Sequence, residues 1–249
     1  MRPTVWIPLI LCFIVTGCFA TLDSGLNVKS FNDRGVMMYA DITHGKAPYA
    51  KDPSVIKFKD KYWMYYSVPE LEGMLGWRIC IANSDDLITW KKVGVIQPEQ
   101  KVEANGFCAP AAIIINGKLN LFYQSYGNKK LDAICHAWSD DGIHFTRNPA
   151  NPIFRPHGDW TCGRAIDAEA VIDGDRLLLY FASRDVDYKI QLIGVAAAPL
   201  NSDLSPSHWT QLVDAPILKP TLDWEKNCIE APSIIKRDGA FYMFYAGAY

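Results

Sequence analysis

The sequence predicts an all-β protein of the five-bladed β-propeller type, with about four blades present in this chain. A template of two strands joined by a tight turn recurs four times, at intervals of 57, 58 and 63 residues, and no helix of useful length separates the copies. Repeats of this length that each supply a small antiparallel sheet are typical of propellers. A β-sandwich with accidental internal similarity is the alternative.

Each copy pairs an apolar strand with an aromatic strand. The first strands are predicted at Asp52–Phe58, Ala109–Ile115, Asp167–Ile172 and Glu230–Ile235, and the second at Tyr62–Ser67, Leu119–Ser125, Leu177–Ser183 and Phe241–Gly247. Asn116-Gly117, Asp173-Gly174 and Asp238-Gly239 lie between them. Such pairs favour hairpins because both residues tolerate positive φ.

A third strand follows the first three hairpins. It is predicted at Trp77–Asn83, Ala133–Ser139 and Ile190–Ala197, and a polar turn then leads to Trp90, Phe145 and Trp209. We therefore expect four strands in a complete unit, the number that a propeller blade requires.

Composition excludes two classes of protein. The 25 Lys and Arg against 27 Asp and Glu give a net charge of −2, so the chain lacks the basic excess of a nucleic-acid-binding surface. The 49% of hydrophobic residues excludes a disordered chain. We expect a monomer with no nucleic-acid partner.

The N-terminus has the pattern of an export signal. Arg2 precedes an apolar run at residues 5–15, and small residues follow up to Ala20. This predicts a signal peptide at residues 1–20, too short to span a membrane, ahead of a propeller domain at residues 21–249. Residues 15–18 resemble a bacterial lipobox, in which Cys18 is lipidated, and cleavage after Ala20 is the alternative. We expect a protein that is anchored by lipid in the periplasm or at the cell surface, or secreted.

Cysteine and histidine spacing does not indicate a metal site. Beyond the predicted signal the cysteines lie at positions 80, 108, 135, 162 and 228 without a C-x-x-C pair, and the five histidines show no ligand spacing. We expect these cysteines to be small buried residues, and we predict no catalytic metal.

The first strand of each copy is expected to be the innermost strand of its blade, and three of these four inner strands begin with an acidic residue. Asp52, Asp167 and Glu230 stand at this position and Ala109 takes it in the second unit. Because inner strands line the propeller channel, we expect the three carboxylates to converge. Crowding separates carboxyl pKa values, as general acid/base cleavage of a glycosidic bond requires. Structural alternatives are a turn role for Asp52, pairing of Asp167 with Arg164 or Arg184, and pairing of Glu230 with a lysine.

Three segments resemble the catalytic signatures of glycoside hydrolase family 43, which contains arabinanases, arabinofuranosidases and xylosidases. They are Lys51–Ile56, Ile166–Ala170 and Ile229–Ile234, and the resemblance extends over roughly residues 45–249. It implies a general base at Asp52, a general acid at Glu230, and Asp167 as the residue that keeps Glu230 protonated and orients it. It also implies inversion, with base and acid about 6.5–9.5 Å apart. Fructan hydrolases, anhydrogalactosidases and mannoside phosphorylases share the architecture.

The chain departs from that pattern at several points. Cys108–Ala111 stands where the family often has Trp-Ala-Pro-Asp, Ala168 replaces a usual proline, and Glu169 is an alternative for the role of Asp167. A fifth leading residue is expected near position 290, so we expect the propeller domain to be incomplete at its C-terminus. The resemblance is compatible with a structural calcium in the channel, but its usual fifth-blade ligand is missing, and we expect no other cofactor.

Aromatic and planar polar side chains near the blade mouths are candidates for substrate binding: Trp77, Asn105, Tyr126, Trp160, Arg184 and Trp224. Trp160 and Arg184 are favoured, and packing between blades is the alternative. The leading hypothesis is an inverting glycosidase that acts on arabinose- or xylose-containing polysaccharide (xylan, arabinan) of plants or algae. A fructan hydrolase, a glycoside phosphorylase and a catalytically silent carbohydrate-binding propeller are the alternatives.

Overall fold

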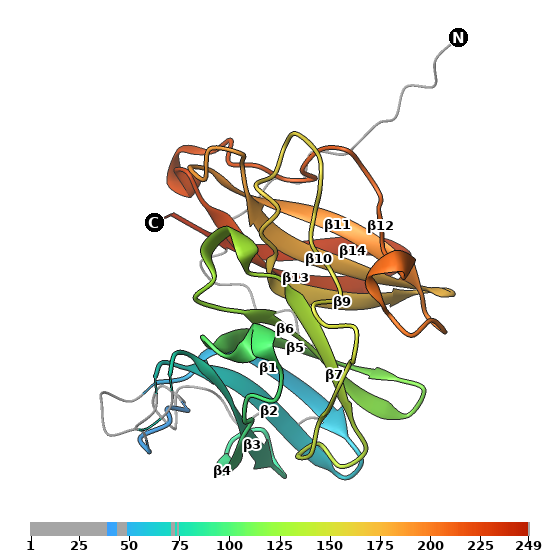
Figure 1. Cartoon of the computed structure of the whole chain (residues 1–249). Coiled ribbons are helices and arrows are strands. Elements are labelled where there is room, and N and C mark those ends of the chain that lie inside the picture. The colour runs from blue at the N-terminus through green and yellow to red at the C-terminus, as the bar shows by residue number, and fades with distance from the viewer. Residues whose placement is uncertain (1–38, 44–48, 71–72, 74, 249) are drawn as a thin grey trace, which may run out of the picture. The chain divides into compact units, whose positions relative to one another are not determined.

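The computed structural model describes residues 39–43, 49–70, 73 and 75–248. They belong to one compact unit, Tyr39–Tyr249, built of four antiparallel sheets (Figure 1). Helical structure in the described residues is limited to short 3-10 turns, none of which is long and apolar enough to cross a membrane. The predicted signal peptide and Cys18 lie outside these residues.

Three sheets have four strands each, in chain order, as the repeat predicts. The first contains β1 (Lys51–Phe58), β2 (Lys61–Val68), β3 (Arg78–Ser84) and β4 (Lys91–Val95). The second contains β5 (Phe107–Ile115), β6 (Lys118–Ser125), β7 (Ile134–Ser139) and β8 (Thr146–Arg147). The third contains β9 (Ile166–Asp173), β10 (Arg176–Arg184), β11 (Gln191–Pro199) and β12 (Thr210–Gln211), and the fourth pairs β13 (Ile229–Arg237) with β14 (Ala240–Gly247). The 3-10 turns are η2 (Lys101–Glu103), η3 (Lys129–Leu131), η4 (Pro206–His208) and η5 (Asp223–Glu225).

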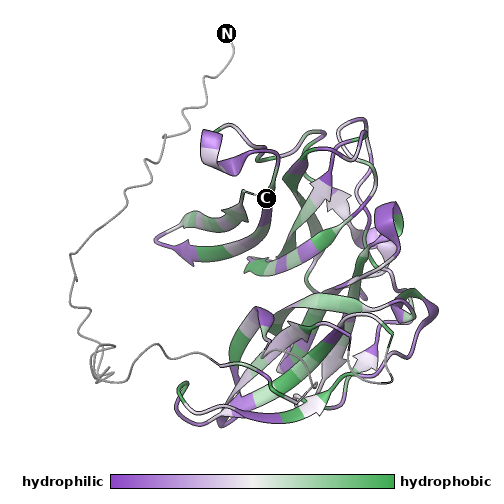
Figure 2. Cartoon of the chain, turned by 90° about the vertical axis from the view of Figure 1, so that its left-hand side faces the viewer, coloured by the Kyte–Doolittle hydropathy of each residue, from purple (hydrophilic) through white to green (hydrophobic). Residues whose placement is uncertain are grey.

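The sheets adjoin through their inner strands, because β1 contacts β5, β5 contacts β9 and β9 contacts β13. This succession around a common axis is the propeller arrangement. Hydrophobic and hydrophilic residues alternate along many of the strands (Figure 2), and the hydrophobic ones pack between neighbouring sheets. Tyr65 and Phe107 belong to the core between the first and second sheets, and Phe122 and Phe181 to the core between the second and third.

A β-bulge interrupts each inner strand and changes the repeat alignment. Lys51 pairs with Ser67, but the next paired residue is Ser54, and the same shift follows Cys108, Ile166 and Glu230. The residue that opens each bulge has a positive φ: Asp52 (52°), Ala109 (50°), Asp167 (50°) and Ala231 (50°). Glu230 is therefore equivalent to Lys51, and the prediction that three acids share one repeat position is wrong for Glu230. The copies align by bulge geometry, which apolar patterning does not reveal.

The cysteines that the structure describes are small strand or loop residues. Cys80, Cys108 and Cys135 are buried, as predicted, and are free thiols, whereas Cys162 is partly exposed.

Candidate active site

A cavity of about 410 Å³ opens where the four inner strands meet. Asp52, Asp167 and Glu169 line it together with residues of the bulges, which are Pro53, Ala109, Pro110, Ala168 and Ala231. The bulges bring these residues to the cavity, because the positive φ at each one turns the strand away from its regular pleat.

The ammonium group of Lys51 lies close to the three predicted catalytic acids. Its Nζ lies 2.9 Å from Oδ1 of Asp52. Burial opposes the charge of Lys51, but the carboxylates of Asp52, Asp167 and Glu230 outweigh it and raise the pKa of the ammonium. The three acids thus lie within electrostatic range of one ammonium group, although they come from three different sheets.

The carboxyl of Asp167 is only partly ionised near neutral pH. Burial raises the pKa of its carboxyl to about 7, and the neighbouring Glu230 and Asp52 carboxylates add to the effect. Its backbone N–H donates to Oε1 of Gln124, 2.7 Å away, which holds the strained bulge in place.

Glu230 is held by a side chain from the third sheet. Nε2 of Gln191 donates a hydrogen bond to Oε2 of Glu230, and Oε1 of Gln191 accepts one from Nε of Arg184 at 3.1 Å. The Arg184 guanidinium also lies over the ring of Tyr188, 4.8 Å from its centroid. Arg184, which was predicted to bind substrate, is thus linked to the predicted acid Glu230 through the side chain of Gln191.

Glu169 connects the third sheet to the fourth by a hydrogen bond. Its Oε1 accepts a hydrogen bond from the backbone N–H of Ile234 at 3.1 Å, just as Oγ of Ser54 accepts one from Ala112 at 2.9 Å. Burial raises the pKa of Glu169 to about 7. Among the carboxylates, however, those of Glu230 and Asp52 have the largest effect on the pKa of Asp167, so they are its main charged neighbours rather than Glu169.

Trp77 immediately precedes β3, next to Lys51, and Asn105 lies in the turn before β5. The ammonium of Lys51 is 5.9 Å from the centre of the Trp77 ring, which also contacts the rings of Tyr49 at 5.7 Å and Tyr126 at 5.9 Å. Asn105 is exposed, and its Nδ2 donates to Oδ1 of Asn128 at 2.9 Å. The aromatic group of Trp77 and the two tyrosines therefore stands beside the carboxylates.

Trp160 occupies a packing position. It lies 6.2 Å from the Phe181 ring, against the core between the second and third sheets, and its indole N–H is buried without a hydrogen-bond partner. Trp224 stacks on Tyr245 at 5.6 Å and is about half exposed. Neither lines the cavity that Asp52 and Asp167 share, and the position of Trp160 agrees with the packing alternative.

Lys51, Gln124 and Gln191 are the site residues that sequence reasoning missed. Gln124 and Gln191 are almost fully buried in segments that otherwise read as apolar strands. A polar residue inside such a strand, close to an inner-strand signature, is the signal that would have found them, because buried polar side chains need partners. Among the described residues, no group of three or more His, Cys, Asp and Glu side chains is placed to hold a metal ion.

The comparison with family models decides the family. The model for glycosyl hydrolases family 43 matches residues 46–249, the part of the chain that carries all four sheets. The chain belongs to this family. A crystal structure of a thermostable family-43 glycoside hydrolase shares the fold of this family 43 chain, with a TM-score of 0.61 at 22% identity over 85% of this chain and 68% of that one.

Two curated relatives of this family 43 chain come from Thermoanaerobacter sp. (strain X514). A 1,2-beta-oligomannan phosphorylase is 27% identical over 237 residues, which are 92% of this chain and 74% of that protein. A beta-1,2-mannobiose phosphorylase is 28% identical over 246 residues, 95% of this chain and 74% of that protein. Family and relatives together indicate an enzyme of the glycosidase type with a saccharide substrate.

Proposed function

We propose that this family 43 enzyme hydrolyses O-glycosidic bonds with inversion, using Asp52 as general base and Glu230 as general acid. The observation that carries the proposal is the convergence of Asp52, Asp167 and Glu230 on Lys51, with a pKa of about 7 at Asp167. A cluster that is partly protonated near neutral pH has both an acid and a base available.

The reaction needs one proton removed and one delivered. Asp52 takes a proton from a water molecule, whose oxygen attacks the anomeric carbon while the bond to the leaving oxygen breaks. Glu230 gives its proton to that leaving oxygen, so atoms and charge balance over the step. The ionised form of Asp167 disfavours a further negative charge beside it, and so favours a proton on Glu230, while Gln191 holds the Glu230 carboxyl in place.

Electrostatics favour water over phosphate as the nucleophile. Asp52, Asp167 and Glu169 line the cavity, and Lys51 is the cation bonded to the first of them. An anionic phosphate entering this cavity would meet carboxyl groups that are at least partly ionised near neutral pH, whereas a neutral water molecule would not be repelled by them. The carboxyl groups of the cavity therefore favour hydrolysis.

A glycoside phosphorylase is the second candidate. Both curated relatives are named as phosphorylases. In addition, Lys130, Arg164 and Arg184 surround the Tyr188 ring at 5.8, 5.9 and 4.8 Å from its centre. Arg164 is close enough to lower the pKa of Asp167, so a basic group that suits phosphate stands beside the acids.

For the substrate we propose arabinose- or xylose-containing glycans of plant or algal polysaccharide, on the strength of the signature segments. The names of the curated relatives add β-1,2-linked mannosides to the substrates that must be tested. Export, a lipid anchor at Cys18 and a monomeric state remain predictions.

The test is a screen of aryl α-arabinofuranosides, aryl β-xylosides, arabinan, xylan and β-1,2-mannobiose with and without inorganic phosphate. Hydrolysis predicts product release in phosphate-free buffer that Asp52→Asn and Glu230→Gln abolish. Product formation that requires phosphate and yields a sugar 1-phosphate would replace hydrolase by phosphorylase. Turnover that survives both substitutions would refute the assigned roles.

A further inference from the structure

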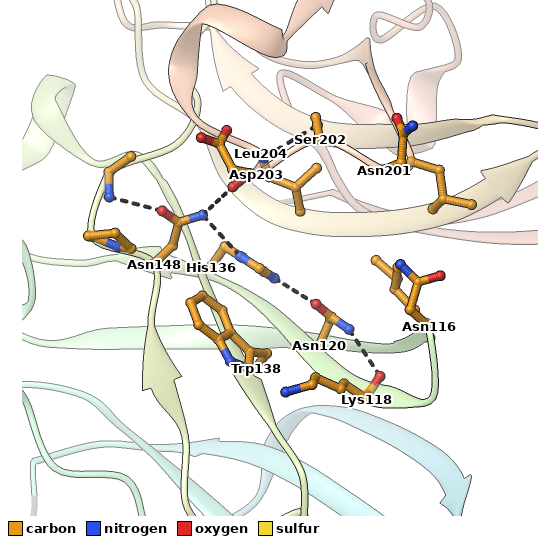
Figure 3. Close-up of a pocket in the computed structure, with 14 residues that line it drawn as sticks. Asn116, Lys118, Asn120, His136, Trp138, Asn148, Asn201, Ser202, Asp203 and Leu204 are labelled. Atoms are coloured by element: carbon orange, nitrogen blue, oxygen red, sulfur yellow. Dashed lines mark hydrogen bonds between the residues drawn. The ribbon is translucent and has the colours of Figure 1, made fainter.

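A second cavity of about 510 Å³ lies between the second and third sheets (Figure 3). Its walls come from the β5–β6 turn, from β6 and β7, and from the loop that follows β11. It shares no lining residue with the cavity that contains Asp52 and Asp167. The proposed reaction therefore leaves this cavity unexplained.

One wall of the cavity is a buried network of neutral side chains. Nε2 of His136 lies 2.9 Å from Oδ1 of Asn120, and Nδ1 of His136 lies 3.3 Å from Nδ2 of Asn148. Nδ2 of Asn148 also donates to the backbone carbonyl of Asp203 at 2.8 Å, which ties the second sheet to the third. Figure 3 shows this chain of bonds.

The network determines which ring nitrogen of His136 carries the proton. Oδ1 of Asn148 accepts a backbone hydrogen bond from Ala150, so its Nδ2 donates to Nδ1 of His136. Nδ2 of Asn120 donates to the backbone carbonyl of Lys118, so Nε2 of His136 donates to Oδ1 of Asn120. Burial lowers the pKa of His136 to about 4, which keeps the imidazole neutral. This wall is therefore preformed and uncharged near neutral pH.

Three side chains at the cavity have polar groups without a hydrogen-bond partner in the described part of the protein. The amides of Asn116 and Asn201 and the indole N–H of Trp138 form no hydrogen bond within the described part of the chain. Figure 3 shows Asn116 and Asn201 on different sheets, with the Asn201 amide pointing away from Asn116, and the Trp138 ring beside His136. The charged residues of the rim already have polar partners: Nζ of Lys118 lies 3.3 Å from the Asp140 carboxylate, and the Asp203 carboxylate lies 2.9 Å from Nδ1 of His208.

We propose that this cavity binds a neutral saccharide. Primary amides donate to and accept from sugar hydroxyls, and the C–H face of a sugar ring packs on an aromatic ring such as Trp138. An apolar ligand would cover the exposed amides of Asn116 and Asn201 without offering them a partner. A charged ligand would have to compete with the partners that Lys118 and Asp203 already have. The volume lies within the usual range of small-ligand sites, about 300–1,000 Å³.

The proposal goes beyond the proposed reaction, because a chain that cannot turn over substrate would still bind sugar here. The experiment therefore uses the full chain with Asp52→Asn and follows the indole N–H signals of the tryptophans by NMR. Xylo-, arabino- and β-1,2-manno-oligosaccharides are the probes, and Trp138→Phe assigns the Trp138 signal. We expect a saturable shift of that signal with at least one probe.

Two variants test the contacts and one serves as control. Trp138→Ala removes the reporting indole, so its binding is followed by isothermal titration calorimetry, and it is expected to weaken binding at this cavity at least about tenfold. Asn201 is exposed, and Asn201→Ala leaves the Trp138 ring in place. This variant is expected to weaken binding several-fold. It keeps the test valid if Trp138→Ala fails to fold. Trp90→Ala, whose indole bonds the carbonyl of Leu87 near the first sheet, is expected to leave the affinity unchanged.

Absence of a Trp138 shift with every probe would overturn the proposal, as would unchanged affinity in both test variants. Turnover by the wild-type chain is measured separately. Turnover without a Trp138 shift refutes the second site alone, whereas a Trp138 shift without turnover supports the second site and refutes the proposed hydrolase.

Discussion

Gln191 donates a hydrogen bond from Nε2 to Oε2 of Glu230, across two neighbouring sheets. Arg184 determines which end of the Gln191 amide faces the carboxyl, because a guanidinium has donors only and its Nε occupies the Oε1 side. Gln191 is 1% exposed, so its amide is held within the protein. The candidate acid is therefore oriented from β10 and β11 as well as by its own strand.

Replacement of Gln191 by Leu should lower kcat by about ten- to a hundredfold, the effect expected for a lost hydrogen bond to an ionisable group. KM should change little. The alkaline limb of the pH–rate profile should move to higher pH, because the ionised Glu230 carboxylate loses a donor. Steady-state kinetics from pH 4 to 9 measure both effects.

The matched control for Gln191→Leu is Gln211→Leu on β12 of the same sheet, where Gln211 bonds the backbone of His157 at 3.1 Å. It should leave the pH profile unchanged. A drop in melting temperature with an unaltered pH profile in Gln191→Leu would mean that the residue is structural only.

Substitution of Asp52 by Asn should reduce turnover by about 10²–10⁴-fold, the usual contribution of a positioned general base. The fold should persist, because the amide has nearly the same shape and removes a charge from a crowded cavity. Kinetics on the best aryl glycoside measure the loss, and circular dichroism checks the fold. Asp60→Asn, at an exposed residue in the β1–β2 turn, should retain wild-type turnover.

Asp167 should make the protein less stable as the pH rises. The pKa of its carboxyl is about 7 in the folded chain against 3.8 as the reference value, so between these values the folded state binds more protons than the unfolded state. The free energy of unfolding must therefore decrease through this range. Asp167→Asn should be more stable than the wild type at pH 8, by at most about 4 kcal/mol, and similar to it near pH 4.

Urea unfolding of both proteins at pH 4 and pH 8 measures this difference, and the comparison cancels the contribution of Glu169, whose pKa is also raised to about 7. A variant that is less stable than the wild type at pH 8 would show that the folded chain favours the charged form of Asp167.

Trp160 should contribute to stability rather than to substrate binding. Trp160→Ala should lower the free energy of unfolding by about 3–5 kcal/mol, because it empties space beside Phe181. Trp160→Phe should be tolerated better, since it removes an indole N–H that has no partner. KM of the folded Trp160→Phe variant should match that of the wild type, and a large rise in KM would restore the sugar-binding role.

The repeating hairpins could be predicted from the sequence because each depends on local signals. The turn at Asn116-Gly117 separates β5 from β6, and Asp238-Gly239 separates β13 from β14, where apolar runs on either side make strands the natural choice. The order of the sheets followed from the repeat alone. Family 43 membership agreed with the signature segments.

The details of the site could not be predicted in the same way. The bulges place Glu230 opposite Ala246, in the register position of Lys51, and a one-residue shift of this kind depends on strand pairing rather than on apolar pattern. The packing of Trp160 and the contact of Arg184 with Gln191 are tertiary, between residues whose neighbours in the chain give no indication of them.

The stereochemistry of the first product tests the proposed reaction most directly. Proton NMR of a fresh digest in phosphate-free buffer should show the released sugar with the anomeric configuration opposite to that of the substrate, before mutarotation sets in. Retention of configuration, or release of sugar only after phosphate is added, would contradict hydrolysis in which Asp52 activates water and Glu230 protonates the leaving oxygen.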